Sequence, residues 1–203
     1  LWTRKRSLFH SEINMTTDTI LSIFLGVGLA ASVGFRVFLP LFALSLASYF
    51  GVWELNDNWQ WIGSLVAVLT LGVATLLEIF AYFIPWFDNL LDSIAVPLAA
   101  IAGTAVMVST VADLDPVITW SLAIIAGGGT ATAIKGAGAT GRLASTATTG
   151  GLANPVITTV ETGTAAVVSV ASIFAPILAA VLVIIILVII FRIYRKLRPK
   201  ANT

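Results

Sequence analysis

The chain has 203 residues, of which 58% are hydrophobic and only 10% are charged. A soluble globular domain is about 45–50% apolar and about 25% charged, so this composition excludes a soluble enzyme, a nucleic-acid-binding domain and a disordered chain. The formal net charge of +1 gives no electrostatic basis for binding a polyanion. The chain has no cysteine, which excludes disulfides, thiol catalysis and cysteine-ligated metal sites. The sequence therefore predicts an integral membrane protein.

Residues 1–18 are expected to form a cytoplasmic N-terminal extension. It carries Arg4, Lys5 and Arg6, and Met15 lies just before the first apolar stretch. Translation could begin at Met15, in which case residues 1–14 are an upstream extension. No small-residue cleavage site follows a short apolar core, so we expect no cleavable signal peptide.

Seven stretches without charge follow, and each is a candidate for crossing the membrane, which takes about 20 mostly apolar residues in a helix. They are residues 19–35, 37–53, 58–77, 93–112, 116–134, 143–160 and 162–191. The first two are separated only by Arg36, and Pro40 follows four residues later. Because proline lacks a backbone donor and disfavours helix before it, residues 19–50 are predicted to form one broken element. It either crosses with a kink or turns back as a re-entrant hairpin, and residues 136–151 leave the same alternatives open.

The distribution of basic residues predicts the orientation. Residues 4–6 and the tail 192–203 are basic, so the positive-inside rule places both termini in the cytoplasm and requires an even number of crossings. The acidic connections 54–59 and 113–116 suit the outer side. Six crossings satisfy this pattern, except that residues 88–92 would then place acidic side chains inside.

The two halves of the chain are weakly similar, which predicts an internal repeat. The matching segments are 22–36 with 121–135, 75–78 with 158–161, and 93–97 with 172–176. We interpret residues 19–112 and 113–191 as two membrane repeats. They are inverted if each crosses three times, as in many secondary transporters, and parallel if the broken elements re-enter. The predicted fold is an all-α transmembrane bundle of about six spans, built from two three-helix repeats with broken first helices.

Four charged residues at span depth are the first candidates for a functional site: Arg36, Glu78, Lys135 and Glu161. An ionised group inside the bilayer costs at least about 2.5–3.5 kcal/mol, so it is expected to be paired or to face water. The simplest arrangement pairs Arg36 with Glu78 and Lys135 with Glu161. Such pairs either form an anion or proton site at the broken helices or only fix the packing of the helices.

Asp88 and Asp92 are four residues apart and share a face of a helix. Two carboxylates at this spacing could bind a divalent cation, and the alternative is a solvated helix start. Residues 136–141 match the pattern Gly-x-Gly-x-x-Gly, but a membrane span rather than a strand precedes them, which argues against a dinucleotide site. The small residues between Gly127 and Gly163 are expected to let helices pack closely or to line a polar cavity.

The sequence carries no visible catalytic machinery. His10 is the single histidine and lies in the N-terminal extension, and no nucleophile–base motif is present. We therefore expect a protein that is not an enzyme and that has neither a cofactor nor a bound metal.

Two segments that mix charged and apolar residues resemble a known family. They are residues 28–40 (GLAASVGFRVFLP) and residues 78–92 (EIFAYFIPWFDNLLD). Both are similar to a family of small membrane proteins catalogued as domain of unknown function 4126, and residues 135–161 also look like that family. The resemblance covers roughly residues 19–190. It implies a polytopic membrane protein and supplies no activity.

These observations favour a small transporter, channel or lipid-moving protein of the inner membrane, with a site between the broken helices. Arg36 and Lys135 would meet an anionic group, while Glu78 and Glu161 would balance them or relay protons. The alternative is a non-catalytic subunit or scaffold of a membrane complex, in which residues 192–200 contact anionic lipid or a partner. The expected partners are membrane lipids and a homo-oligomer or larger complex, but no nucleic acid.

Overall fold

The computed structural model describes the backbone of residues 2–111 and 114–197, and the side chains of residues 17–84, 91, 94–111 and 114–196. Every regular element in this part of the chain is helical, which confirms the predicted all-α class. The α-helices are α1 (Trp2–Phe35), α2 (Phe38–Tyr49), α3 (Leu65–Ala81), α4 (Pro85–Thr110), α5 (Pro116–Leu122), α6 (Gly129–Thr149), α7 (Asn154–Phe174) and α8 (Pro176–Leu197). A 3-10 helix, η1 (Asp57–Gly63), precedes α3, and a π-helix, η2 (Ala123–Gly128), joins α5 to α6.

Four helical segments are long and apolar enough to cross a membrane, and a fifth results if η1 and α3, which meet at 64°, are one bent span. The four are Thr17–Phe35, Pro116–Thr149, Asn154–Phe174 and Pro176–Lys196. Helix α2 has only 12 residues. The apolar part of α4 within the described side chains, Ile94–Thr110, is also short. The six spans predicted from uncharged windows are therefore not confirmed.

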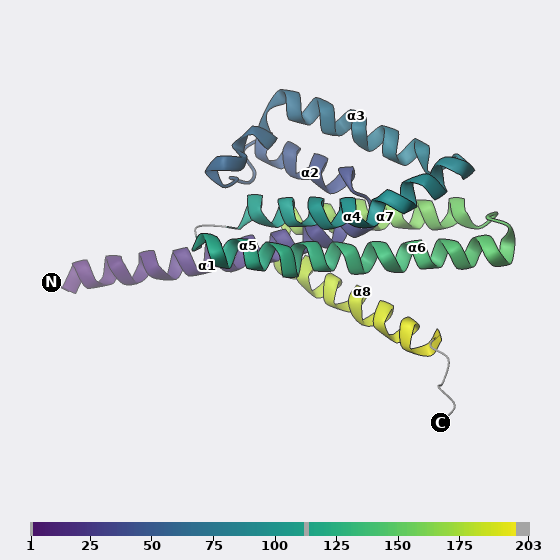
Figure 1. The fold of residues 1–203 in the computed structure, drawn as a ribbon. Coiled ribbons are helices and arrows are strands. Elements are labelled where there is room, and N and C mark those ends of the chain that lie inside the picture. Colours follow the sequence, from purple (N-terminus) through teal and green to yellow (C-terminus); the bar gives the residue numbers. More distant parts are fainter. Residues whose placement is uncertain (1, 112–113, 198–203) are drawn as a thin grey trace.

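The predicted break in the first element is present. Helix α1 ends at Phe35, and α2 begins at Phe38 and turns back along the bundle (Figure 1). Pro40 lies in the first turn of α2, where a missing N–H group is tolerated. The break therefore separates two helices that lie side by side.

The predicted break in the second element is wrong. Helix α6 continues from Gly129 through Lys135 to Thr149 without interruption. Residues 136–149 contain no proline, and their small side chains fit a continuous helix. The run ends only at Gly150, whose φ of 63° gives the left-handed C-cap that glycine readily adopts.

The internal repeat is not supported by the positions of the matched residues. Glu78 lies near the end of α3, whereas Glu161 lies in the second turn of α7. Pro97 lies inside α4, whereas Pro176 begins α8. Segments that look alike in sequence therefore occupy unlike places in their helices.

Helix α1 is the centre of the bundle and packs against α4, α6, α7 and α8. Small residues permit these contacts, because a Cβ added at Gly28 would lie 2.2 Å from Ser172 Oγ, and one at Gly34 would lie 2.6 Å from Ile134 Cβ. Gly127 of η2 meets Gly103 of α4 just as closely. The prediction that glycines of the second half allow close helix packing is confirmed at Gly127.

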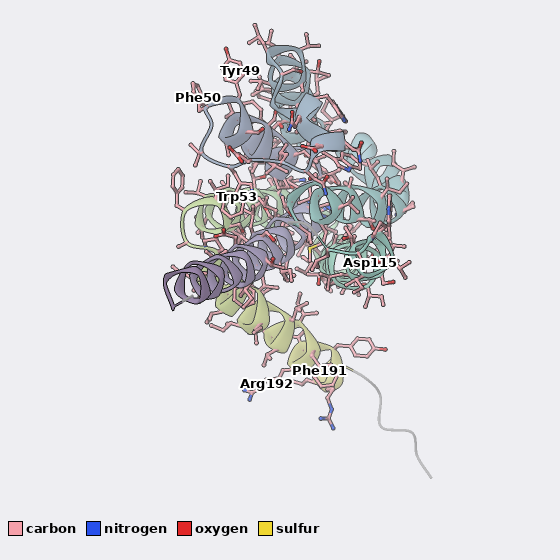
Figure 2. The ribbon with its side chains drawn as sticks, turned by 90° about the vertical axis from the view of Figure 1, so that its left-hand side faces the viewer. Tyr49, Phe50, Trp53, Asp115, Phe191 and Arg192 are labelled. Atoms are coloured by element: carbon pink, nitrogen blue, oxygen red, sulfur yellow. The ribbon has the colours of Figure 1, made fainter. Side chains whose placement is uncertain are left out.

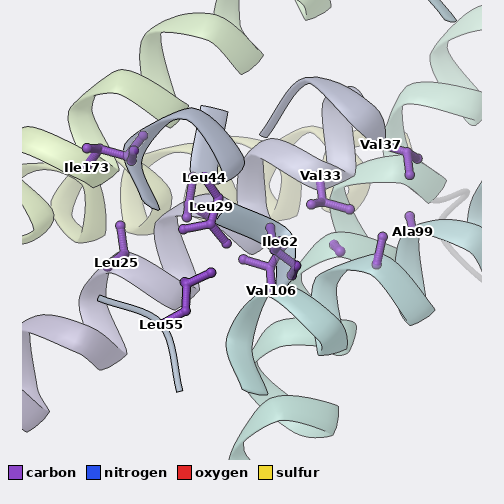
Figure 3. Close-up of a cluster of buried hydrophobic side chains, with 13 residues drawn as sticks. Leu25, Leu29, Val33, Val37, Leu44, Leu55, Ile62, Ala99, Val106 and Ile173 are labelled. Carbon is purple, nitrogen blue, oxygen red and sulfur yellow. The ribbon is translucent and has the colours of Figure 1, made fainter. Parts of the chain in front are cut away.

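A cluster of buried apolar side chains joins α1, α2, η1 and α4 and includes Ala131 of α6 and Ile173 of α7. Figure 3 shows Leu29 and Val33 of α1 between Leu44 of α2, Ile62 of η1 and Val106 of α4. This core holds the end of α1 in place, beside the break.

The outer surfaces of the helices are apolar, as expected of side chains that face lipid. Only 11% of the α8 segment is buried inside the molecule, compared with 56% of the α1 segment. Figure 2 shows Phe191 and Arg192 on the part of α8 that leaves the bundle. The start of α1 and the end of α8 lie at opposite ends of the molecule (Figure 1).

Candidate functional site

Arg36 lies in the break between α1 and α2 and is fully buried. Its Nε donates to Thr162 Oγ1 at 2.9 Å, and its Nη2 donates to the Thr158 carbonyl oxygen at 3.1 Å. The same Nη2 lies 3.7 Å from Glu161 Oε2. The predicted pairing of Arg36 with Glu78 is therefore wrong, because α7 supplies the carboxylate that Arg36 meets.

Glu78 has a different role, at the start of α2. Its two carboxylate oxygens accept hydrogen bonds from the backbone N–H groups of Val37, at 2.7 Å, and Phe38, at 3.0 Å. The first N–H groups of a helix lack partners within the helix, and a negative charge there also complements the helix dipole. Glu78 therefore stabilises the beginning of the second half of the broken element.

Lys135 acts at the other side of the break. Its Nζ donates to the carbonyl oxygen of Phe35, the last residue of α1, at 2.8 Å. The helix dipole carries a partial negative charge at the C-terminus of a helix, so a cation there is stabilising. The predicted pairing of Lys135 with Glu161 is wrong, because Lys135 of α6 donates to the carbonyl oxygen of Phe35 instead. Lys135 and Glu78 therefore supply hydrogen-bond partners to both helix ends at the break.

Arg142 completes the cluster and was not among the predicted site residues. Its guanidinium group donates to Glu161 Oε2, so this carboxylate contacts both Arg142 and Arg36. Gly138 makes room for the carboxylate, because a Cβ there would lie 2.7 Å from Glu161 Oε1. A sequence signal for Arg142 exists: it follows Lys135 by seven residues, which is two turns along one face of a helix.

Tyr82 is the second residue that the sequence interpretation missed. Its buried ring lies 4.1 Å from Arg36 Cζ, 4.4 Å from Arg142 Cζ and 5.7 Å from Lys135 Nζ, measured to the ring centroid. Cations are attracted to an aromatic face at such distances. Tyr82 follows Glu78 by four residues at the end of α3, and this spacing could have indicated a shared face.

Two polar atoms of the cluster have no hydrogen-bond partner in the described part of the chain. They are Arg36 Nη1 and Thr158 Oγ1, and both residues are 0% exposed. Native proteins satisfy most buried polar groups, since an unmade hydrogen bond costs about 1–3 kcal/mol and more for a charged group. Within the described residues, these two atoms are the polar groups of the cluster that the protein leaves without a hydrogen-bond partner.

The remaining predicted site features do not add to this cluster. Asp88 and Asp92 lie on the first turns of α4, but their side chains are outside the described residues. Within the side chains that are described, no group of three or more histidine and acidic residues could hold a metal ion. The glycines of residues 136–141 lie inside helix α6 rather than between a strand and a helix, which excludes the dinucleotide-binding interpretation.

Two open cavities lie far from the cluster, around the connection that precedes η1. One, of about 520 Å³, is lined by Asp18, Glu54 and Asp57, and the other, of about 600 Å³, by Asn58, Trp59 and Trp120 among others. Asp18 and Arg36 are 18 residues apart on α1, which corresponds to about 27 Å. Acidic groups therefore gather at the start of the α1 membrane segment, Thr17–Phe35, and the buried basic groups lie at its other end.

A family model described as domain of unknown function (DUF4126) matches residues 23–196. The match covers the cluster in full. No curated protein and no solved structure matches the chain.

Proposed function

The chain belongs to the DUF4126 family, and on that premise we propose that it is a small membrane transport protein that moves an anion past the break between α1 and α2. The observation that carries this proposal is the burial of Arg36, Lys135 and Arg142 around Tyr82, with one nitrogen of Arg36 unpaired. An anion is the ligand that such a site would attract.

The energetics of the cluster support a ligand more than packing alone. Buried ion pairs are costly, and apolar residues of the same volume often stabilise a protein equally well or better. A network that only fixed the helices would gain nothing by leaving a guanidinium nitrogen without a partner. The unpaired Nη1 of Arg36 is understandable if a ligand fills its place during part of a transport cycle.

The contacts suggest how an anion would enter. Glu161 contacts Arg142 directly but lies 3.7 Å from Arg36. An incoming anion would bind to Arg36, while Glu161 remains paired with Arg142 as its counter-ion. Glu78 and Lys135 would hold the two helix ends fixed meanwhile, as the half-helices of many transporters are held around a site.

We place the protein in the inner membrane, with the basic end of α8 in the cytoplasm. The connection at Glu54 and the residue Asp115 then face outside. Because α1 starts at the end of the molecule opposite the end of α8, the start of the α1 span also faces outside in this proposal, unlike in the expectation from the sequence. Single cysteines at Asn56, Asp115 and Thr146 test the orientation, since the chain is free of cysteine. An impermeant thiol reagent applied to intact cells is expected to label the first two, and labelling of Thr146 alone would reverse the orientation.

The function itself is tested by anion flux in vesicles. Purified protein is reconstituted into liposomes loaded with chloride, nitrate or phosphate, and efflux is followed with an ion-selective electrode. Arg36→Gln is expected to abolish flux of the transported anion, and Arg192→Gln, which changes an exposed arginine of α8, is expected to leave flux unchanged. Normal flux in folded Arg36→Gln and Glu78→Gln variants would refute the proposal.

A second candidate function is that of a scaffold subunit in a membrane complex, and the exposure of α8 favours it. Only 11% of this segment is buried inside the molecule, and its apolar face includes Ile184 and Ile185. This face would dock against a partner helix. Co-purification of a stable partner in mild detergent, lost when both isoleucines are replaced by alanine, would support this function. A monodisperse single chain would count against it.

A further inference from the structure

We infer that Arg36 Nη1 and Thr158 Oγ1 together bind one compact monovalent anion, of the size of a halide. This inference rests on the proposed function and deepens it, because it assigns the anion to two atoms. Neither atom is among those that already bond within the cluster.

The two atoms lie close together because of what is covalently attached to them. Arg36 Nη2 donates to the carbonyl oxygen of Thr158, so the guanidinium group that carries Nη1 contacts the residue that carries the hydroxyl. Nη1 carries two N–H donors, and the hydroxyl supplies one O–H donor. A guest that only accepts hydrogen bonds fits this set better than a water molecule, which would need acceptors in return.

Thr158 is an exception among the threonines of α7. Thr159, Thr162 and Thr164 each donate to the carbonyl oxygen four residues earlier, at 2.9, 2.8 and 2.7 Å. Thr158 has no such bond, although its residue is completely buried. Its hydroxyl is therefore available to a ligand at the one position of α7 that also contacts Arg36 through its carbonyl.

The surroundings define the size and charge of the guest. Both residues are 0% exposed, and neither of the two cavities described above is lined by them. Burial of this kind limits a ligand to one or a few atoms. Arg36 supplies its charge here, and its nearest carboxylate, Glu161, is shared with Arg142.

The test uses bromide as the probe and the full chain in detergent micelles. Bromide is titrated against gluconate at constant ionic strength, and binding is followed by calorimetry and by the midpoint of thermal unfolding. A ligand that binds only the folded state multiplies the unfolding constant by the reciprocal of 1 + [L]/Kd. The heat of bromide binding is therefore expected to saturate, and the stabilisation is expected to keep rising with the logarithm of the bromide concentration above Kd.

The variants isolate the hydroxyl. Thr158→Val keeps the shape and the carbonyl but removes the O–H group, and it is expected to weaken bromide binding by about tenfold, the effect of one hydrogen bond to a charged ligand. Thr159→Val is the matched control on the same helix, and Thr158→Ser keeps the hydroxyl; both are expected to bind like the original chain. Thr158→Ala replaces the valine variant if that variant does not fold.

Two results would overturn the inference: no saturable heat of bromide binding in the original chain, or equal affinities in Thr158→Val and Thr159→Val. Failure of this inference is distinguishable from failure of the proposed function. Anion flux that depends on Arg36 without a bromide site at Thr158 contradicts only the inference. Saturable bromide binding that Thr158→Val weakens, in vesicles that show no flux, contradicts only the transport function.

Discussion

The candidate membrane segments of α1 and α8, Thr17–Phe35 and Pro176–Lys196, are nearly equal in length, yet one is central in the molecule and the other is peripheral. The α1 segment has a mean hydropathy of 1.7 and is 56% buried, whereas the α8 segment has a mean hydropathy of 3.1 and is 11% buried. The less hydrophobic helix is the central one. In a soluble protein the order would be reversed, since the most apolar helix would be driven to the core.

The difference follows from the solvent. Lipid is as apolar as a leucine side chain, so an isoleucine gains little by moving from lipid to a protein interior. Small and polar residues decide the contacts instead, as at Ser32 of α1, whose hydroxyl donates to the Ala165 carbonyl oxygen at 2.7 Å and lies 2.7 Å from Ser169 Oγ. Helix α1 is central because it contains glycine and serine at its contacts and is followed directly by the charged residue Arg36. Helix α8 is peripheral because it consists mainly of branched apolar residues.

The largest effect is expected where charges hold the end of α1. Glu161→Gln removes the carboxylate that both Arg36 and Arg142 contact, and breaking a buried ion pair on one side costs about 3–5 kcal/mol. The free energy of unfolding is measured by SDS titration in mixed micelles. Glu54→Gln is the control, because Glu54 is exposed and surface changes are worth about 0.5 kcal/mol or less. Equal losses in the two variants would mean that charge does not fix the end of α1.

A smaller effect is expected where α1 meets its neighbours through glycine. Gly28→Ala places a Cβ 2.2 Å from Ser172 Oγ of α7, and overpacking of this kind costs about 1–3 kcal/mol. Gly141→Ala in α6 is the matched control. Nothing lies within 4 Å of its added Cβ, so the gain in helix propensity is expected to stabilise the protein by up to about 1 kcal/mol. The same unfolding titration tests both variants, and a destabilising Gly141→Ala would show that helix α6 has a partner on that face.

Much of the architecture could be predicted from the sequence, for identifiable reasons. Arg36 followed by Pro40 predicted the break after the first span, and charges at span depth predicted that Arg36, Glu78, Lys135 and Glu161 matter together. The structure brings these four residues to one place, although their functional roles remain predictions. Pro40 was a useful signal because a proline is tolerated in the first turn of a helix, but Pro97 lies inside α4 without ending it.

The pairing of the charges could not be predicted, because it depends on which helices meet. The simplest arrangement of the charges paired Glu78 with Arg36, but α2 turns back and the backbone N–H groups of Val37 and Phe38 donate to Glu78 instead. The continuity of α6 could not be predicted for a related reason. Residues 136–151 fit a broken element as well as a continuous helix, and in the structure Gly138 leaves room for the Glu161 carboxylate. Small residues permit a close approach, but the sequence alone does not identify which helix or side chain approaches them.

The smallest effect is expected on α8, at two adjacent residues. Val183 is 1% exposed and packs in a cluster with Ala31 and Ile134, whereas Ile184 is 62% exposed. Val183→Ala is expected to lose about 1 kcal/mol of stability because its packing contacts disappear. Ile184→Ala is expected to be nearly neutral, since lipid tails fill the space that the side chain leaves.

This pair also separates the two candidate functions in the unfolding titration. If the outer face of α8 contacts lipid only, Ile184→Ala leaves both the stability and the oligomeric state unchanged. If that face packs against a second protein helix, the loss at Ile184 equals or exceeds the loss at Val183, and it grows with protein concentration because association is coupled to folding. The second result would show that the outer face of α8 forms a protein interface rather than a lipid-facing surface, and it would favour the scaffold function over the transport function.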